Sequence, residues 1–189
     1  MDNDRRQAEF VAAAAALFEE KGHARTSIRD VTDRMGVTRS LFYHYFPNKE
    51  ALTNAVIDEQ VDTFMARIQQ LDDSFDSDHQ LESLQEFVSS FRALVLGENS
   101  FGGCVMREKN LELHLTFTLR CANRLADHYA HLRRINAEER RHESLNLVHL
   151  RETMYVLSTG IISLLYHEPE VCDEALLEVV ANALSIRLD

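Results

Sequence analysis

Apolar residues recur along this chain at intervals of three and four positions, the spacing that places them on one face of an α-helix. The first such run covers residues 4–22 and ends in charged residues followed by Gly22. Its buried face is expected to consist of Phe10, Val11, Ala14, Ala15 and Phe18. Because glycine readily takes the left-handed conformation that ends helices, the pattern predicts a half-buried first helix that stops at Gly22.

The same spacing predicts longer helices further along the chain. They cover residues 48–71, 80–96, 104–134, 145–166 and 171–187, and the third of them has a break near residues 113–116. The helix over 48–71 is long enough to connect two parts of the molecule. The acidic stretch 72–78 is the best candidate for a linker, and residues 97–103 are expected to form a loop. Since no alternating strand pattern and no internal repeat occurs, the chain predicts an all-α fold of about nine helices.

Two short helical patterns meet at Gly36 within residues 26–46. Ser27 can cap the first helix, with Asp30 three residues later as in a capping box, and Thr38 can cap the second. Two short helices joined by a glycine turn form a helix-turn-helix, whose second helix lies in the major groove of DNA. A helical hairpin with an ordinary polar surface would give the same pattern.

The second short helix has polar positions left over once its apolar residues are assigned to the core. Arg39 can hydrogen-bond to guanine or to a phosphate, and Ser40 is small enough to let the helix approach the bases. Tyr43 and His44 can bind phosphate oxygens, which fixes the position of the helix without reading sequence. Lys49 places a charge beside the start of the next helix, where backbone amides also attract phosphate. These residue types predict a DNA contact surface.

The net charge of −11 does not exclude such a surface, because the charge is unevenly divided. Residues 1–50 hold eight Lys and Arg against eight Asp and Glu, whereas residues 51–189 hold twelve against twenty-three. An acidic body would repel phosphate, while a neutral N-terminal part could still meet it. The cations expected to do so are Arg25, Arg29, Arg34, Arg39 and Lys49.

Residues 10–52 resemble, without a gap, the N-terminal domain of the TetR family of bacterial transcriptional regulators. The resemblance rests on Leu17-Phe18, Gly22, Thr26-Ser27, Gly36-Val37, the run from Leu41 to Phe46, and Lys49-Glu50-Ala51-Leu52. It implies a helix-turn-helix DNA-binding domain over residues 1–47 and an effector-binding and dimerisation domain over residues 48–189. It also implies a homodimer on palindromic operator DNA, from which a small-molecule effector releases it.

The resemblance assigns DNA contacts residue by residue. The residues are Thr26, Ser27, Thr38, Arg39, Ser40, Tyr43, His44 and Lys49. Thr32 stands where the family usually has alanine and Phe42 where it usually has leucine, and packing can absorb both. Ser40 replaces a common glycine, which leaves the preferred DNA sequence open.

The resemblance further suggests an effector pocket between the middle helices and a dimer interface made by the last two. The pocket candidates are Phe64, Phe91, Asn110, His114, Phe117, Cys121, Met154 and Tyr155. The polar groups that could orient a ligand are His114, Arg120, Cys121 and Arg124. The interface candidates are Tyr155, Thr159, Gly160, Ile162, Leu176, Val180 and Leu184, in a four-helix bundle of two chains. For both sets, burial in the core of a single chain is the alternative.

Other function classes find little support in the sequence. The chain has neither a secretory leader nor an apolar run of the roughly 20 residues that span a bilayer, which favours a cytoplasmic protein. The resemblance implies that it is bacterial. Cys104, Cys121 and Cys172 are expected to be buried thiols, and no zinc quartet accompanies the nine histidines. No nucleophile elbow, phosphate loop or dinucleotide motif indicates catalysis. We therefore expect a protein that is not an enzyme and holds no metal or cofactor.

With this resemblance, the sequence predicts a sequence-specific transcriptional regulator, most simply a repressor released from its operator by a small molecule. Two alternatives remain open. One is a DNA-binding protein of chromosome organisation that needs no effector and has a filled core. The other is a ligand- or metal-binding protein that lacks operator recognition.

Overall fold

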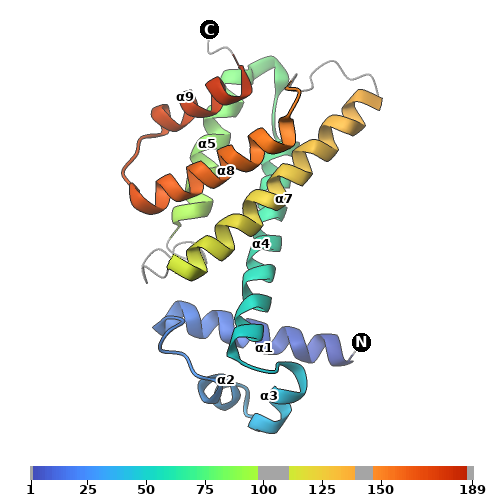
Figure 1. Cartoon of the computed structure of the whole chain (residues 1–189), viewed down its shortest axis with the longest axis vertical. Coiled ribbons are helices and arrows are strands. Elements are labelled where there is room, and N and C mark those ends of the chain that lie inside the picture. Colours follow the sequence, from blue (N-terminus) through green and yellow to red (C-terminus); the bar gives the residue numbers. More distant parts are fainter. Residues whose placement is uncertain (1, 98–110, 139–146, 187–189) are drawn as a thin grey trace.

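The computed structural model describes residues 2–97, 111–138 and 147–186, and within these ranges it contains helices and no strand (Figure 1). The helices are α1 (Asp2–Lys21), α2 (Ile28–Met35), α3 (Arg39–Tyr45), α4 (Lys49–Asp73), the 3-10 helix η1 (Ser77–His79), α5 (Gln80–Leu96), α7 (Leu111–Glu138), α8 (Leu150–His167) and α9 (Asp173–Leu184). The predicted all-α fold is confirmed, and the nine helices expected are close to the number in the described residues. None of the described helices is both long and apolar enough to cross a membrane.

Helices α1, α2 and α3 pack around an aromatic cluster centred on Phe10. The ring of Phe10 meets those of Phe42 and Phe46 edge-on, with centroid separations of 5.7 and 6.2 Å. Phe42 is completely buried, and Thr32, which is also buried, donates its hydroxyl to the carbonyl of Arg29 at 3.0 Å. Both departures from the family pattern are therefore absorbed, one by ring packing and one by an internal hydrogen bond.

The predicted caps set the ends of the two short helices. Ser27 Oγ accepts from the Asp30 amide at 3.2 Å, and the Asp30 carboxylate accepts from the Ser27 amide at 2.7 Å, which completes the capping box. Gly36 closes α2 with a φ of 65°, a left-handed conformation that residues with a Cβ resist. Thr38 Oγ1 then accepts from the Leu41 amide at 3.3 Å and starts α3.

The 25-residue helix α4 runs from the α1–α3 group, called the head below, into the group of α5, α7, α8 and α9, called the body (Figure 1). It contacts α1 in the head and α5 and α7 in the body. Leu52 near one end of α4 and Ile68 near the other are both fully buried. One continuous helix is therefore anchored by apolar side chains in both parts of the molecule.

The break predicted near residues 113–116 is wrong, because α7 is continuous over Leu111–Glu138. Leu113 and His114 are buried, whereas Leu115 is 46% exposed. The apolar residues of this stretch therefore lie on both sides of the helix, which obscures the stripe in the sequence. Residues 104–110, expected to begin the same helix, lie outside the described residues.

The acidic stretch 72–78 does not connect the head to the body. Asp72 and Asp73 form the last turn of α4, and the remainder leads through η1 into α5 within the body. Asp72 is partly buried because His128 and Tyr129 of α7 hydrogen-bond to its carboxylate. Of the loop expected over residues 97–103, only Gly97 is described, and it caps α5.

Candidate nucleic-acid interface and internal cavity

The outer face of α3 carries the polar residues expected to meet DNA. Arg39, Ser40, Tyr43 and His44 are all exposed, and Tyr43 keeps 55% of its surface accessible. Positions 39 and 43, like 40 and 44, are one turn apart and therefore share one side of the helix. Phe42 points the other way and anchors α3 in the core of the head. The head thus presents a guanidinium, two hydroxyls and an imidazole on one surface.

Three further candidate DNA contacts lie at the starts of α2 and α3. Ser27 and Thr38 are exposed, and both serve as helix caps. Thr26 is only 3% exposed, and its hydroxyl donates to the carbonyls of Gly22 and Leu17 at 2.8 and 3.3 Å. The structure therefore turns Thr26 into the head, where it fixes the turn between α1 and α2.

A polar cluster joins the head to the start of α4. Lys49 Nζ donates to the carbonyl of His23 at 2.7 Å. The Thr53 hydroxyl donates to the Lys49 carbonyl at 2.9 Å and lies 3.0 Å from His23 Nε2. Burial, together with the Lys49 charge, lowers the pKa of His23 to about 4, so the ring is neutral near pH 7. Periodicity did not identify this cluster, because His23 and Thr53 are 30 positions apart.

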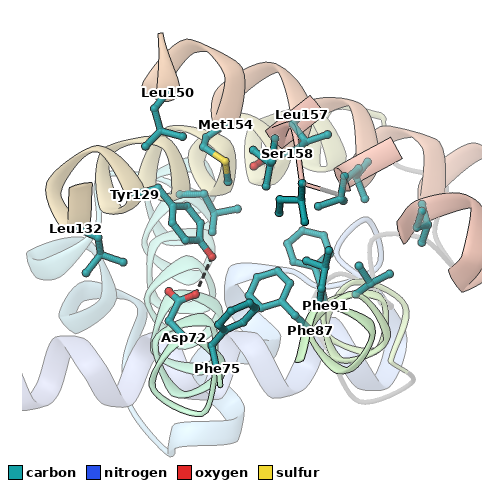
Figure 2. A pocket seen from close by; sticks show the side chains of 18 of the residues that line it. Asp72, Phe75, Phe87, Phe91, Tyr129, Leu132, Leu150, Met154, Leu157 and Ser158 are labelled. Carbon is teal, nitrogen blue, oxygen red and sulfur yellow. Dashed lines mark hydrogen bonds between the residues drawn. The ribbon is translucent and has the colours of Figure 1, made fainter. Parts of the chain in front are cut away.

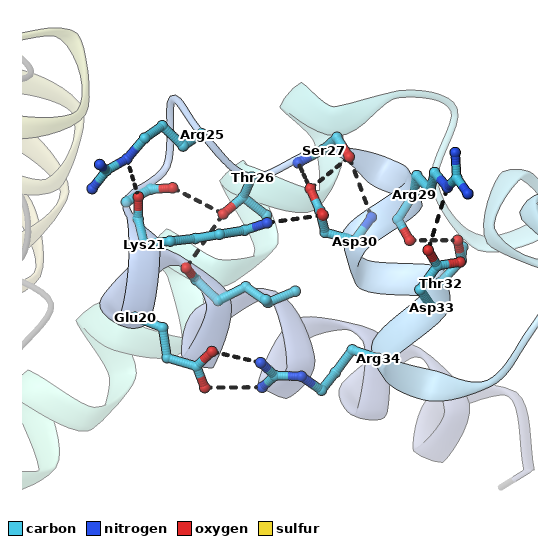
Figure 3. A network of polar contacts seen from close by, with 12 residues as sticks. Glu20, Lys21, Arg25, Thr26, Ser27, Arg29, Asp30, Thr32, Asp33 and Arg34 are labelled. Carbon is cyan, nitrogen blue, oxygen red and sulfur yellow. Dashed lines mark hydrogen bonds and ion pairs between the residues drawn. The ribbon is translucent and has the colours of Figure 1, made fainter.

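Ion pairs hold the head together around α2 (Figure 3). Arg34 donates to both carboxylate oxygens of Glu20, at 3.0 and 2.5 Å, which connects the end of α2 to the end of α1. Lys21 Nζ lies 2.8 Å from Asp30 Oδ1. That contact and the Ser27 hydrogen bonds hold the pKa of Asp30 well below its ordinary value. The Arg34 contact likewise lowers the pKa of Glu20.

Other cations of the head also make contacts within it. Arg29 pairs with Asp33 at 3.3 Å, and Arg25 donates to the Lys21 carbonyl at 2.6 Å. Four of the five cations selected from the charge pattern therefore have partners within the head or at its junction with α4. In the described part of the chain, Arg39 is the one of the five that makes no such contact.

Arginines of α7 hold α4 against the body. Arg120 Nη1 donates to the Asn54 carbonyl at 3.1 Å and to Asp58 at 2.6 Å, while Nη2 donates to Asn54 Oδ1 at 2.6 Å. One turn further along α7, Arg124 pairs with Asp62 at 2.8 Å. Both arginines were expected to orient a ligand, but their guanidinium groups bind α4 instead.

A cavity of about 310 Å³ lies inside the body, between α5, α7, α8 and α9 and beside the last turn of α4 (Figure 2). Its apolar wall includes Phe75, Phe87, Phe91, Leu125, Met154, Leu157 and Ile161. Its polar side chains are Asp72, Gln80, Tyr129, Arg133 and Ser158. This size and polarity are typical of ligand sites, which are apolar clefts with a few placed polar groups.

Of the predicted pocket residues, Phe91 and Met154 lie in this wall. Asn110 lies outside the described residues. Phe64, His114, Phe117, Cys121 and Tyr155 do not line the cavity. Phe64 and Phe117 pack edge-on in the core with centroids 6.2 Å apart, and His114 stacks on the ring of Tyr166 at 3.7 Å. Periodicity identifies buried positions but carries no information on which of them border a void.

At the polar end of the cavity, Asp72 and Tyr129 belong to a hydrogen-bonded group whose third member, His128, lies outside the wall. The Tyr129 hydroxyl donates to Asp72 Oδ1 at 2.9 Å, and His128 Nε2 lies 2.7 Å from Oδ2 (Figure 2). Burial raises the pKa of Asp72, and the hydrogen bonds from His128 and Tyr129 oppose that rise. Burial also raises the pKa of Tyr129, so the phenol stays protonated and remains the donor. The sequence did not reveal this group, because Asp72 lies in what reads as an acidic loop.

The candidate dimer interface is only partly on the surface. Ile162, Leu176 and Leu184 are buried within the single chain and offer no face to a partner. Tyr155, Thr159 and Val180 are half-buried, and Gly160 is exposed. Val156 of α8 and Val179 of α9, by contrast, are 69% and 47% exposed. The apolar stripes of α8 and α9 therefore close the monomer core with one side and leave valines on the other.

Comparison with known proteins relates the N-terminal part of the chain to one family. Residues 10–56 match the model described as bacterial regulatory proteins, tetR family. The transcriptional repressor KstR2 of Mycobacterium tuberculosis is 34% identical over 90 residues, which cover 47% of this chain and 44% of that protein. The transcriptional regulator EthR of Mycolicibacterium smegmatis is 42% identical over 55 residues, which cover 29% of this chain and 25% of that protein. The matches thus span less than half the length of these relatives.

Solved structures share the fold of the whole chain at low identity. RolR without ligand matches with a TM-score of 0.63 at 21% identity over 95% of both chains. RolR in complex with resorcinol has the same TM-score of 0.63 at 20% identity, over 98% of this chain and 94% of that one. A TetR/AcrR family regulator from Thermobifida fusca gives 0.57 at 22% identity, over 95% of this chain and 97% of that one. Residues 10–56 therefore match the TetR family of bacterial regulatory proteins, and the chain as a whole shares its fold with these solved structures.

Proposed function

We propose that this protein is a sequence-specific DNA-binding transcriptional regulator, a repressor that leaves its operator when a small molecule occupies the body cavity. The exposed polar face of α3 carries the proposal, because a helix-turn-helix offers its second helix to the major groove. We divide the chain into a DNA-binding domain, residues 1–47, and an effector-binding and dimerisation domain, residues 48–189. The boundary falls where Asn48 Oδ1 accepts from the Ala51 amide at 2.8 Å and starts α4.

Within the α3 face, we propose Arg39 as the residue that reads a base. Two parallel donors of a guanidinium fit the O6 and N7 acceptors of guanine, and the internal pairing of the neighbouring cations leaves this role to Arg39. Tyr43 and His44 are suited to phosphate contacts, which position the helix. Ser27 and Thr38 lie exposed beside them and can contact further phosphates.

The second part of the proposal is a homodimer formed by α8 and α9. Exposed Val156 and Val179 support it, because the same two helices of a second copy would remove both side chains from water. Two heads held in this way would meet successive major grooves about one helical turn apart.

The position of the cavity supports release by an effector. The last turn of α4 borders the cavity at Asp72, while its start contacts His23 of the head through Lys49 and Thr53. A ligand that binds one orientation of α4 better than another would shift the balance between DNA-bound and free states. RolR, which shares this fold, has been solved with resorcinol. The cavity also disfavours an effector-independent protein of chromosome organisation, which would have a filled core.

DNA binding tests the proposal directly. The protein should protect a palindromic site near its own gene in a footprint, and DNA of unrelated sequence should not compete. Arg39→Ala should weaken specific binding by about 1–3 kcal/mol if Arg39 reads a base. Arg67→Ala removes an exposed cation of α4 and should leave binding unchanged.

One outcome would change the role proposed for Arg39, and another would refute the proposed function. An equal loss of affinity on all DNA sequences for Arg39→Ala would make Arg39 a phosphate contact. Absence of any sequence-specific binding by the dimer would refute the proposed function.

A further inference from the structure

Asp72 is the single acidic side chain among the described residues of the body cavity wall, which is mostly apolar. Asp72 keeps 19% of its side chain exposed, and its two oxygens accept from Tyr129 and His128 of α7. A carboxylate offers roughly four acceptor sites, so these two partners leave capacity for a donor from the cavity. Figure 2 shows Asp72 at one end of the cavity, below the Tyr129 hydroxyl, with the leucines and Met154 beyond.

Arg133 is the one cationic side chain among the described residues of the cavity wall. Arg133 in the wall donates to the carbonyl of Leu147. His128 reaches Asp72 but is not part of the wall. The one contact of Arg133 with a carbonyl leaves its guanidinium charged, but a ligand carboxylate placed at Asp72 would meet a like charge. Because like charges repel strongly where water is scarce, the Asp72 end of the cavity disfavours anions.

We propose that the cavity takes an apolar molecule, neutral or cationic, that carries a hydroxyl or amine donor and directs it to the Asp72 carboxylate. The inference rests on the proposed function as a ligand-responsive regulator and adds the chemical class of the effector. Phe75, Phe87 and Phe91 receive the apolar part, and the Tyr129 hydroxyl holds the carboxylate in place. Since Asp72 belongs to the last turn of α4, the polar contact acts on the helix that carries the head.

Three probes of similar size and different charge test the proposal: para-butylphenol, para-butylbenzylamine and para-butylbenzoate. Their binding to the full-length protein is measured by calorimetry and by displacement of an environment-sensitive dye. The phenol and the amine should bind about ten- to hundredfold more tightly than the benzoate, the range expected for a hydrogen bond to a charged group. Equal affinity for all three probes, or tighter binding of the benzoate, overturns the proposal.

Two variants separate the role of Asp72 from general effects of charge. Asp72→Asn keeps the shape of the side chain and removes its charge, so the preference for the amine over the benzoate should fall by about tenfold or more. Asp73 lies in the same turn but is exposed. The Asp73→Asn variant should therefore keep the preference of the unmodified protein for the amine over the benzoate. An unchanged preference in a folded Asp72→Asn variant overturns the proposal. If that variant does not fold, the order of the affinities of the three probes for the unmodified protein tests the proposal.

Footprinting of the same unmodified protein distinguishes a failure of the proposed ligand class from a failure of the proposed regulatory function. A retained operator footprint together with the wrong order of probes refutes the ligand class alone. Absence of a specific footprint in the unmodified protein refutes the regulatory function on which the ligand class rests.

Discussion

At the scale of single residues, neighbouring hydroxyls in the head have opposite surroundings. Thr26 is buried and donates to the carbonyls of Gly22 and Leu17, whereas Ser27 is exposed and caps α2. The side-chain direction at each position depends on how the turn after α1 folds back onto that helix. A Thr-Ser pair in the sequence therefore indicates a helix start but does not show which hydroxyl can reach DNA.

Replacing Thr26 tests its structural role. Thr26→Val should lower the free energy of unfolding by about 1–3 kcal/mol, because a buried donor to two carbonyls is lost. Thr26→Ser keeps the hydroxyl and should cost no more than about 1 kcal/mol for the missing methyl group. Urea denaturation followed by circular dichroism measures both. A fully folded Thr26→Val protein with reduced operator affinity would instead show that Thr26 contacts DNA.

His23 should make stability depend on pH. Its pKa is about 4 in the folded chain, against 6.5 for an ordinary histidine. Between these values the unfolded chain binds a proton that the folded chain does not, so the free energy of unfolding should fall as the pH is lowered from 6.5 towards 4. His23→Gln should show a smaller fall in urea titrations over the same range. Identical pH slopes for the two proteins would contradict a depressed pKa.

At the scale of helices, α4 is held along its length by polar contacts as well as by its apolar face. Positions 120, 124 and 128 of α7 are four residues apart and therefore share the side that faces α4. Their side chains reach Asp58, Asp62 and Asp72 in that order. The two helices are thus fixed in register, which makes the pair suited to transmit a displacement from the cavity towards the head.

The contacts of Arg120 and Arg124 should differ in strength. Arg120→Met removes donors to both the backbone and the side chain of Asn54 and should lower the free energy of unfolding by about 1–2 kcal/mol. Arg124→Met removes one pair between exposed side chains and should change it by no more than about 0.5 kcal/mol. Parallel urea titrations compare the two variants. Equal effects would show that the Asn54 contacts add nothing to a surface ion pair.

At the scale of the whole molecule, the net acidic charge lies outside the head. Helices α8 and α9, which carry the exposed Val156 and Val179, lie in the body, away from the head (Figure 1). The head is neutral overall, and most of its cations are engaged in internal contacts. Attraction to DNA would therefore be local, concentrated on the α3 face. Two heads joined through α8 and α9 would double this small surface.

Val156 tests the proposed assembly. Val156→Glu should convert the dimer to a monomer in analytical ultracentrifugation and abolish operator binding, because a charge would be buried between two copies without a partner. Leu115→Glu places the same charge on an exposed apolar position of α7 and should leave the dimer intact. A Val156→Glu protein that remains dimeric would place the interface elsewhere.

The sequence by itself determined the all-helical fold, the caps at Ser27 and Thr38, the turn at Gly36 and the polar face of α3. These features depend on residues within about four positions of one another, the range over which helical spacing and capping act. Only the tertiary structure decided that Arg34 and Lys49 have partners, which apolar residues border a cavity, and that Asp72 lies in its wall. The partners involved, such as Glu20 with Arg34 and Asp72 with Tyr129, are 14 and 57 positions apart. Their meeting depends on how whole helices pack, which no local pattern records.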